Sequence, residues 1–196
     1  MEVVVYFAIR APIVSFKCRV ESDISPGFEW RDYTTVNYFK GKRVALFAIP
    51  GAFTPTCSST HLPGYEAAYK ELTVDLGLDE VYCVSVNDSF SMNAWFKSLD
   101  ITNVKPIPDG NGEFTRKMGF LVDKSNLGFG MRSWRYSAII HDGIVENMWV
   151  EPGFKDNADN DPFEVSDAAT MIKWLRSHPD PRKPGAGLPP GSTELI

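Results

Sequence analysis

The feature that most constrains the fold is a pair of short apolar runs separated by a helical pattern. The first run, VALFAI, spans residues 44–49, and the second, VYCVSV, spans residues 81–86. The first run does not alternate polar and apolar residues, which is typical of a strand buried on both faces of a parallel sheet. Between the runs, residues 56–76 have a helical pattern with an expected kink at Pro63-Gly64. The segment therefore predicts a β-α-β unit.

Shorter patterns place further elements around this unit. Residues 14–20 alternate apolar and polar side chains, which predicts a half-buried strand. Asp142-Gly143 separates two strand-like runs, 134–141 and 144–151, and this is the strongest short-range signal for a hairpin. The other expected elements are a helix at 34–40 ending at Gly41, a helix capped by Ser89 or Ser91, an edge strand at 104–107, a helix at 112–118 and a last helix with Ser166 as N-cap. This order predicts an α/β fold of the thioredoxin-like kind, with a mixed central sheet flanked by helices.

Length and composition favour a single domain with a tail. The chain has 196 residues, of which 43% are hydrophobic and 23% charged, so it can bury a sizeable core. We expect residues 1–178 to form the domain. Residues 179–196 are rich in proline and glycine, and we expect them to form a loosely docked tail.

The charge pattern argues against two classes of partner. The net charge is −5 and there is no basic run, so a nucleic acid or an anionic membrane is not an expected partner. No apolar stretch approaches the roughly 20 residues that span a bilayer. Residues 1–9 are apolar but carry Glu2 where a signal peptide is positively charged, so we expect a strand or an irregular arm there.

Cysteine usage indicates the compartment. Cys18, Cys57 and Cys83 are an odd and small set, unlike a secreted disulfide framework. We therefore expect a reducing compartment such as the cytoplasm, with at least one thiol free.

The segment PGAFTPTC, residues 50–57, carries the chemistry. It places Cys57 in the first turn of a predicted helix, directly after a buried strand. The unpaired N–H groups and positive dipole end of a helix N-terminus stabilise an anion, so they favour a nucleophilic thiolate at neutral pH. Pro50 and Gly51 shape a turn that can expose backbone donors to a ligand. The alternative, a buried structural thiol, fits this placement less well.

Thr54 stands three residues before Cys57, where a C-x-x-C motif has its first cysteine. No disulfide can form within this turn, so Cys57 must react with another group. The Thr54 hydroxyl can donate and accept hydrogen bonds, which suits a small substrate with two oxygens, such as a peroxide.

The pattern P-x-x-x-T-x-x-C at Pro50, Thr54 and Cys57 resembles the active-site motif of peroxiredoxins. The longer string FAIPGAFTPTCSSTHLPGY resembles the type 5 members, called type II in plants, as do VSVND, PDGNGEFTRKMG, GFGMRSWRYS and WVEPG. The resemblance runs from about Ile13 to Ser177 and is specific, because separated blocks agree in order. It implies a thioredoxin fold and thiol-dependent reduction of hydrogen peroxide and organic hydroperoxides. No cofactor and no metal are expected.

The resemblance also implies a role for each motif residue. Cys57 is the expected peroxidatic cysteine, which attacks a peroxide oxygen and becomes a sulfenic acid. Pro50 is expected to shield Cys57, and Thr54 to hydrogen-bond the peroxide. Arg132 matches the active-site arginine of the family, whose guanidinium stabilises the thiolate and donates to the departing oxygen. Spacing alone does not bring Arg132 to Cys57.

A second thiol must then reduce the sulfenic acid. Cys83 is the candidate resolving cysteine, because plant-type members often have a cysteine near this place. Pairing with Cys57 would need local unfolding, since Cys83 lies in a predicted central strand. The alternative is that Cys83 is a small core residue and that glutathione with glutaredoxin, or thioredoxin, is the reductant. A homodimer is expected, as in relatives.

Other conspicuous residues have plain structural interpretations. Cys18 lies on the apolar face of its strand and is expected to pack there. His61 lies four residues after Cys57, but a hydrolase or metal site needs further groups that the sequence does not offer. Residues 156–161 lack the spacing of a calcium loop and are expected to be a solvated loop. Phe53 is expected to line a substrate pocket or a dimer contact.

Two other functions are alternatives to a peroxidase. In a redox sensor, Cys57 would pass its oxidation to a partner protein by disulfide exchange. A thiol–disulfide oxidoreductase is disfavoured by the missing C-x-x-C motif.

Overall fold

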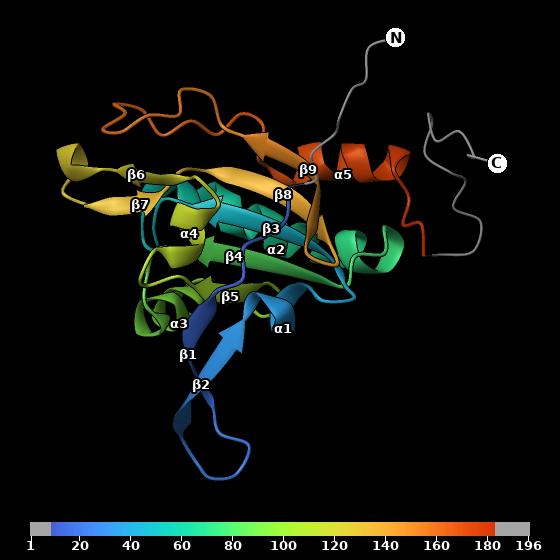
Figure 1. The fold of residues 1–196 in the computed structure, drawn as a ribbon, viewed down its shortest axis with the longest axis horizontal. Helices are drawn as coiled ribbons and strands as arrows, with labels where there is room; N and C mark the ends of the chain where they lie inside the picture. Colours follow the sequence, from blue (N-terminus) through green and yellow to red (C-terminus); the bar gives the residue numbers. More distant parts are fainter. Residues whose placement is uncertain (1–8, 183–196) are drawn as a thin grey trace.

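The computed structural model describes residues 9–182, and its centre is a five-stranded mixed sheet (Figure 1). The strands lie in the order β5 (Lys105–Pro108), β4 (Glu80–Ser85), β3 (Arg43–Ile49), β8 (Tyr136–His141) and β9 (Ile144–Val150). β4 runs parallel to β3 and β5, whereas β8 runs antiparallel to β3 and β9. Every residue of β3 is buried, as expected for an apolar central strand. The structure thus confirms the predicted thioredoxin-like α/β fold.

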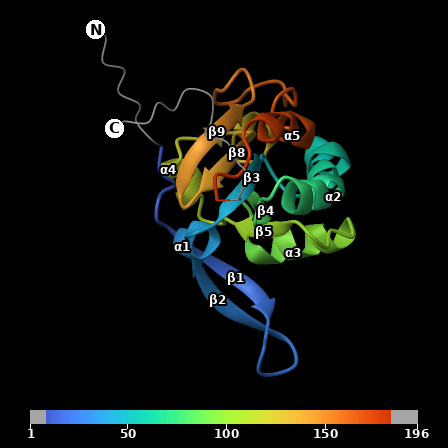
Figure 2. The same ribbon diagram turned by 90° about the vertical axis from the view of Figure 1, so that its right-hand side faces the viewer.

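Helices cover both faces of the sheet (Figure 2). One face carries α2 (Leu62–Lys70), α3 (Ser89–Ser98) and α5 (Ala168–Ser177), and the other carries α1 (Thr35–Phe39) and α4 (Glu113–Lys117). Each face has its own apolar core. The core beneath α2, α3 and α5 contains both Cys57 and Cys83, and the opposite core contains Phe39 and Phe114. The two cysteines therefore lie on the same side of the sheet.

Two small sheets flank the main one. β1 (Ser15–Glu21) and β2 (Phe28–Thr34) form an antiparallel hairpin that projects from the body of the molecule (Figures 1 and 2). β6 (Leu121–Asp123) pairs with β7 (Met131–Ser133) around the 3-10 helix η3 (Ser125–Leu127). The alternating pattern predicts β1, and Cys18 is buried as expected. The partner β2 has no fully buried residue, so apolar patterning does not reveal it.

The predicted helix at 56–76 is present but is not α-helical throughout. Two π-helical turns, η1 (Cys57–His61) and η2 (Glu71–Asp75), lie on either side of α2. Pro63 and Gly64 are inside α2, which follows η1 without a break. The missing N–H of Pro63 therefore falls directly after the π turn, in which Leu62 N donates to Cys57 O. The departures from α geometry therefore lie at the turn that begins with Cys57 and at residues 71–75, and not at Pro63-Gly64. Single π turns occur frequently at functional sites.

Two helix caps differ from expectation. Asp88 caps α3 by accepting from Ser91 N at 2.9 Å, in place of Ser89 or Ser91. Asp167 caps α5 by accepting from Thr170 N at 3.0 Å, in place of Ser166. In each case the aspartate is one position from a predicted serine, and its carboxylate reaches the free N–H of the first turn.

The hairpin predicted at Asp142-Gly143 is confirmed. Asp142 has φ of 48° and Gly143 has φ of 77°, and the tight turns that join twisted strands require such positive values. No helix among residues 9–182 is long and apolar enough to cross a bilayer. The arm at 1–8 and residues 183–196 of the predicted tail lie outside the described residues.

Candidate active site

The turn between β3 and η1 places Cys57 at the carboxyl-terminal end of the central strand β3. β3 ends at Ile49, Pro50 is buried directly after it, and Cys57 begins η1 with no exposed surface. Ser58 N donates to Thr54 O at 3.0 Å, which starts the helical bonding, and the Ser58 hydroxyl accepts from Trp95 Nε1 at 3.0 Å. The sulfur is therefore held in a fixed first turn, as the segment at 50–57 predicts.

A cavity of about 430 Å³ lies over this turn. It is lined by Pro50, Gly51, Ala52, Phe53, Thr54, Pro55, Phe129 and Arg132. The Thr54 hydroxyl donates to Gly51 O at 2.7 Å, which leaves its oxygen free to accept a further hydrogen bond. Phe53 is 60% exposed with φ of 62°, so the strained turn presents its ring at the mouth, in line with its predicted place in a pocket.

The guanidinium that contacts Cys57 belongs to Arg135. Its Nη1 lies 3.5 Å from Cys57 Sγ, and Arg135 is 1% exposed. Arg135 precedes Tyr136, the first residue of β8, which pairs with Ala48 near the end of β3. The antiparallel pairing of β8 with β3 thus brings together two residues 78 positions apart. Burial lowers the pKa of Arg135, but the neighbouring Cys57 and Asp161 more than offset this and keep it raised.

The prediction that Arg132 stands at the sulfur is therefore corrected. Arg132 lies in β7, and it donates from Nη1 to Val86 O at 2.7 Å and from Nε to Phe129 O at 3.0 Å. These bonds direct it to the end of β4 and the rim of the cavity. The signal that could have identified Arg135 is its position at the start of the predicted hairpin strand, beside the end of β3.

His61 holds Arg135 from the helix side. Its Nδ1 lies 3.0 Å from Arg135 Nη1, and because a guanidinium only donates, Nδ1 must accept. Its Nε2 then carries the proton and donates to Ser166 O at 3.2 Å. Burial, followed by the charge of Arg135, lowers the pKa of His61 to about 3. A neutral imidazole committed to Arg135 is not a general base for Cys57, so the hydrolase interpretation has no support here.

The other two cysteines are buried thiols. Burial raises the pKa of Cys83 well above its usual value, and the adjacent Cys57 adds to this effect. Burial likewise raises the pKa of Cys18, whose sulfur lies 3.5 Å from Tyr38 Oη on the far side of the sheet. All three cysteines are free thiols. Of Cys18 and Cys83, only Cys83 shares a core with Cys57, so it stays the candidate for a resolving cysteine.

The acidic loop at 156–161 makes contacts that its sequence does not reveal. Within residues 9–182 no group of three or more His, Cys, Asp or Glu side chains is arranged to hold a metal. Asp156 accepts from Asp123 N at 2.8 Å, and Asp161 forms an ion pair with Arg135. The loop is exposed as predicted except at Ala158, which is buried, and Asp161 combines its exposure with the ion pair to Arg135.

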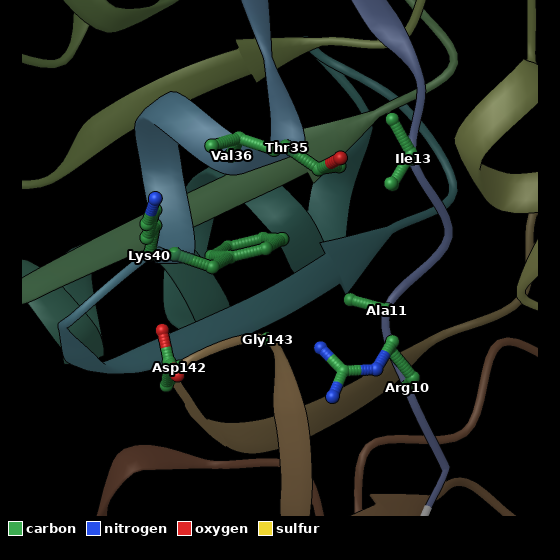
Figure 3. A pocket seen from close by; sticks show the side chains of 9 residues that line it. Arg10, Ala11, Ile13, Thr35, Val36, Lys40, Asp142 and Gly143 are labelled. Carbon is green, nitrogen blue, oxygen red and sulfur yellow. The ribbon is translucent and has the colours of Figure 1, made fainter.

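A second hollow, of about 230 Å³, lies near the start of β3, whereas Cys57 follows its end (Figure 3). Arg10, Lys40 and Asp142 are its charged groups, and Asp142 already accepts from Gly41 N at 2.7 Å. None of the nine residues that line it carries a thiol or a hydroxyl except Thr35, whose hydroxyl accepts from Val14 N at 3.2 Å. The cavity next to the turn that carries Cys57 is therefore the better candidate for a reaction at a thiol.

Sequence and fold both match known proteins of one kind. The Redoxin family model matches residues 30–172. A peroxiredoxin from Synechocystis is 56% identical over 170 residues, covering 85% of this chain and 89% of that protein. The chloroplastic Peroxiredoxin-2E of Arabidopsis thaliana is 44% identical over 138 residues, covering 69% of this chain and 56% of that protein. The crystal structure of the antioxidant protein of Plasmodium falciparum, a 1-Cys peroxiredoxin, superposes with a TM-score of 0.81 at 35% identity, covering 87% of this chain and 99% of that one.

Proposed function

This chain belongs to the peroxiredoxin family and is a thiol-dependent peroxidase, and we propose that its reaction runs on the sulfur of Cys57. The observation that carries the proposal is the buried guanidinium of Arg135, 3.5 Å from a sulfur that begins a helix. A fixed positive charge and a helix N-terminus both stabilise a thiolate.

In the first step the Cys57 thiolate attacks the terminal oxygen of a peroxide R–O–O–H. The S–O bond forms as the O–O bond breaks, so the sulfur is oxidised to a sulfenic acid and the peroxide is reduced. The leaving oxyanion R–O⁻ takes a proton and departs as water or an alcohol. Two thiols then return the sulfenic acid to the thiol, releasing one water and one disulfide.

The surrounding residues stabilise the charge that moves along S–O–O in the transition state. Thr54 has an oxygen available to bind the peroxide from the cavity, and Pro50 shields the sulfur from bulk water. Arg135 takes the role that sequence comparison gave to Arg132. Among the described residues its Nε is buried without a partner, so this N–H is a donor available to a peroxide oxygen. Arg132, on the cavity rim, is proposed to contact the substrate and not the sulfur.

The reductant is proposed to be a thiol outside this chain, either glutathione with glutaredoxin or thioredoxin. The buried Cys83 has a raised pKa, so it is a thiol and a poor attacking group while the fold is closed. Its role as the resolving cysteine is the alternative and requires local opening. We further propose a homodimer in a reducing compartment such as the cytoplasm. Three free thiols are consistent with that compartment.

Intact mass after one equivalent of hydrogen peroxide tests this function. We would compare fully reduced wild type, Cys83→Ser and Cys57→Ser, with a sulfenic-acid trap in parallel. A trappable gain of about 16 Da in the first two, absent from Cys57→Ser, is the expected result. A loss of about 2 Da in wild type, replaced by that gain in Cys83→Ser, would assign resolution to Cys83. No change in wild type at near-stoichiometric peroxide would refute the proposal that Cys57 is peroxidatic.

A further inference from the structure

The loop between β9 and α5 brings a carboxylate against the arginine of the active site. Asp161 Oδ2 accepts from Arg135 Nη2 in an ion pair between a side chain that is 1% exposed and one that is 35% exposed. The other terminal nitrogen, Nη1, is the one that faces Cys57 Sγ and His61 Nδ1. Asp161 therefore binds the guanidinium on the side away from the sulfur.

The same loop is anchored firmly enough to hold this contact. Glu151 is buried at the end of β9 and accepts hydrogen bonds from the backbone N–H groups of Glu164, Val165 and Ser166, at 2.8, 3.0 and 2.8 Å. Ser166 O in turn accepts from His61 Nε2. The loop is thus tied to the sheet at Glu151 and to the active-site helix at His61.

An aromatic ring from this loop completes the enclosure of the arginine. The Phe163 ring lies 4.8 Å from the His61 ring, and the Arg135 guanidinium carbon lies 5.7 Å from the Phe163 centroid. Asp161, Phe163 and Ser166 therefore approach the Arg135–His61 pair from one short stretch of loop. A planar guanidinium has few orientations in which all these contacts are satisfied together.

We propose that Asp161 is a positioning residue for the peroxidase reaction: it orients the Arg135 guanidinium so that Nη1 faces the Cys57 thiolate. The proposal rests on the proposed role of Cys57. It makes the loop at 152–166 part of the reaction machinery, because displacement of this loop would release the arginine from the sulfur.

Charge and orientation act in opposite directions here, and this makes the proposal testable. If Asp161 were only a nearby negative charge, its removal would make the thiolate easier to form and shift the thiolate titration to lower pH. If Asp161 orients Arg135, its removal weakens the contact between guanidinium and sulfur and shifts that titration to higher pH. The sign of the shift separates the two roles, and a general loss of packing does not determine it.

The experiment uses Asp161→Asn and Asp161→Ser, with Asp159→Asn as the matched control. Asp159 is an exposed carboxylate of the same loop, and no hydrogen bond of its side chain is recorded within residues 9–182. The thiolate titration would be followed by the rate of Cys57 alkylation against pH, with mass mapping to exclude Cys18 and Cys83. The rate of reaction with hydrogen peroxide would be measured by stopped flow, and Asp161→Glu would test rescue by a second carboxylate.

For both Asp161 substitutions we expect the titration midpoint to rise by about one pH unit and the rate constant at neutral pH to fall about tenfold, as for loss of a charged hydrogen bond. Asp159→Asn should match wild type, and Asp161→Glu should recover most of the rate. A midpoint that falls or stays unchanged, with a wild-type rate, would overturn the proposal. If wild type itself does not react with peroxide, the proposed role of Cys57 fails instead, so the two failures are distinguishable.

Discussion

Two arginines that are three positions apart in the chain have different places in this site. Arg135 is buried with its guanidinium on the Cys57 sulfur, and Arg132 is partly exposed with its guanidinium on two backbone carbonyls. Both lie in the block GFGMRSWRYS, which by itself does not say which one reaches the thiol. The answer depends on where β8 starts, because the side chain just before it lies next to the end of β3.

Lysine substitutions at the two arginines should therefore have unequal effects. Arg135→Lys keeps the charge but loses the fork that spans Cys57, His61 and Asp161, so we expect the rate of Cys57 oxidation to fall ~100-fold or more. In Arg132→Lys the same rate should fall less than about tenfold, because this substitution loses contacts at the cavity rim only. Unfolding curves would first show that both variants are folded. Stopped-flow measurement with hydrogen peroxide then compares the rates of Cys57 oxidation in the two variants. A larger loss in Arg132→Lys would restore the assignment made from sequence.

At the scale of elements, the segment from β9 to α5 is organised by one buried carboxylate. Glu151 is 1% exposed and accepts from three backbone N–H groups and from the Ser166 hydroxyl. Burial raises its pKa, but the hydrogen bonds from Ser166, Val165 and Glu164 outweigh burial and leave the pKa lowered. The loop that carries Asp161 therefore depends on an ionised Glu151.

The neutral variant Glu151→Gln should lower the free energy of unfolding by ~2 kcal/mol at pH 7, because it leaves buried N–H groups without a charged acceptor. The lowered pKa also fixes the sign of the pH dependence. The contribution of Glu151 is complete above the pKa of an unfolded glutamate, about 4.5, and is lost as pH falls through the lower folded value. Urea unfolding at pH 7 and pH 4 measures the free energy of unfolding and its dependence on pH.

The matched control is Glu164→Gln in the same loop, where the side chain is exposed. We expect it to unfold like wild type at both pH values. The Glu151→Gln protein should show a smaller loss of stability between pH 7 and pH 4 than wild type. Equal losses in the two proteins would mean that Glu151 does not anchor the loop through its charge.

At the scale of the whole molecule, the sheet separates two cores, and the core beneath α2, α3 and α5 holds two buried thiols. Cys57 and Cys83 lie in the same core and are free thiols. A disulfide between them needs the first turn of η1 to leave its packed position. The Cys57 sulfur has no exposed surface, so a peroxide also needs some movement of the turn to reach it. A small peroxide needs a smaller movement than a second protein thiol does, so the two steps should respond differently to conditions that loosen the fold.

Any disulfide between Cys57 and Cys83 should therefore form faster in urea below the unfolding transition, whereas sulfenic acid formation should speed up far less. Quenched mass spectrometry after one equivalent of peroxide follows both products over time, and Cys83→Ser is the control without a partner thiol. A disulfide rate that is independent of urea would mean that the pair meets in the closed fold. No disulfide at any urea concentration would make Cys83 a core residue alone.

Local sequence determined the parts of this protein that depend on neighbouring residues. The apolar run at 44–49 specified a buried strand, Asp142-Gly143 specified a hairpin, and the turn from Pro50 to Thr54 put Cys57 at a helix start. These features follow from side-chain periodicity and turn chemistry within a few residues. They were sufficient to predict the fold and the place of Cys57 at the start of a helix.

Tertiary structure decided which distant side chains meet the Cys57 thiol. Arg135 reaches Cys57 only because β8 pairs antiparallel with β3, and Asp161 reaches Arg135 only because Glu151 folds the loop back over the sheet. Strand pairing and loop anchoring join residues that are far apart in the chain. No local sequence pattern specifies that Arg135 will contact Cys57 or that Asp161 will contact Arg135. A long-range contact is set by the packing of the whole core, so its members become visible only once the chain is folded.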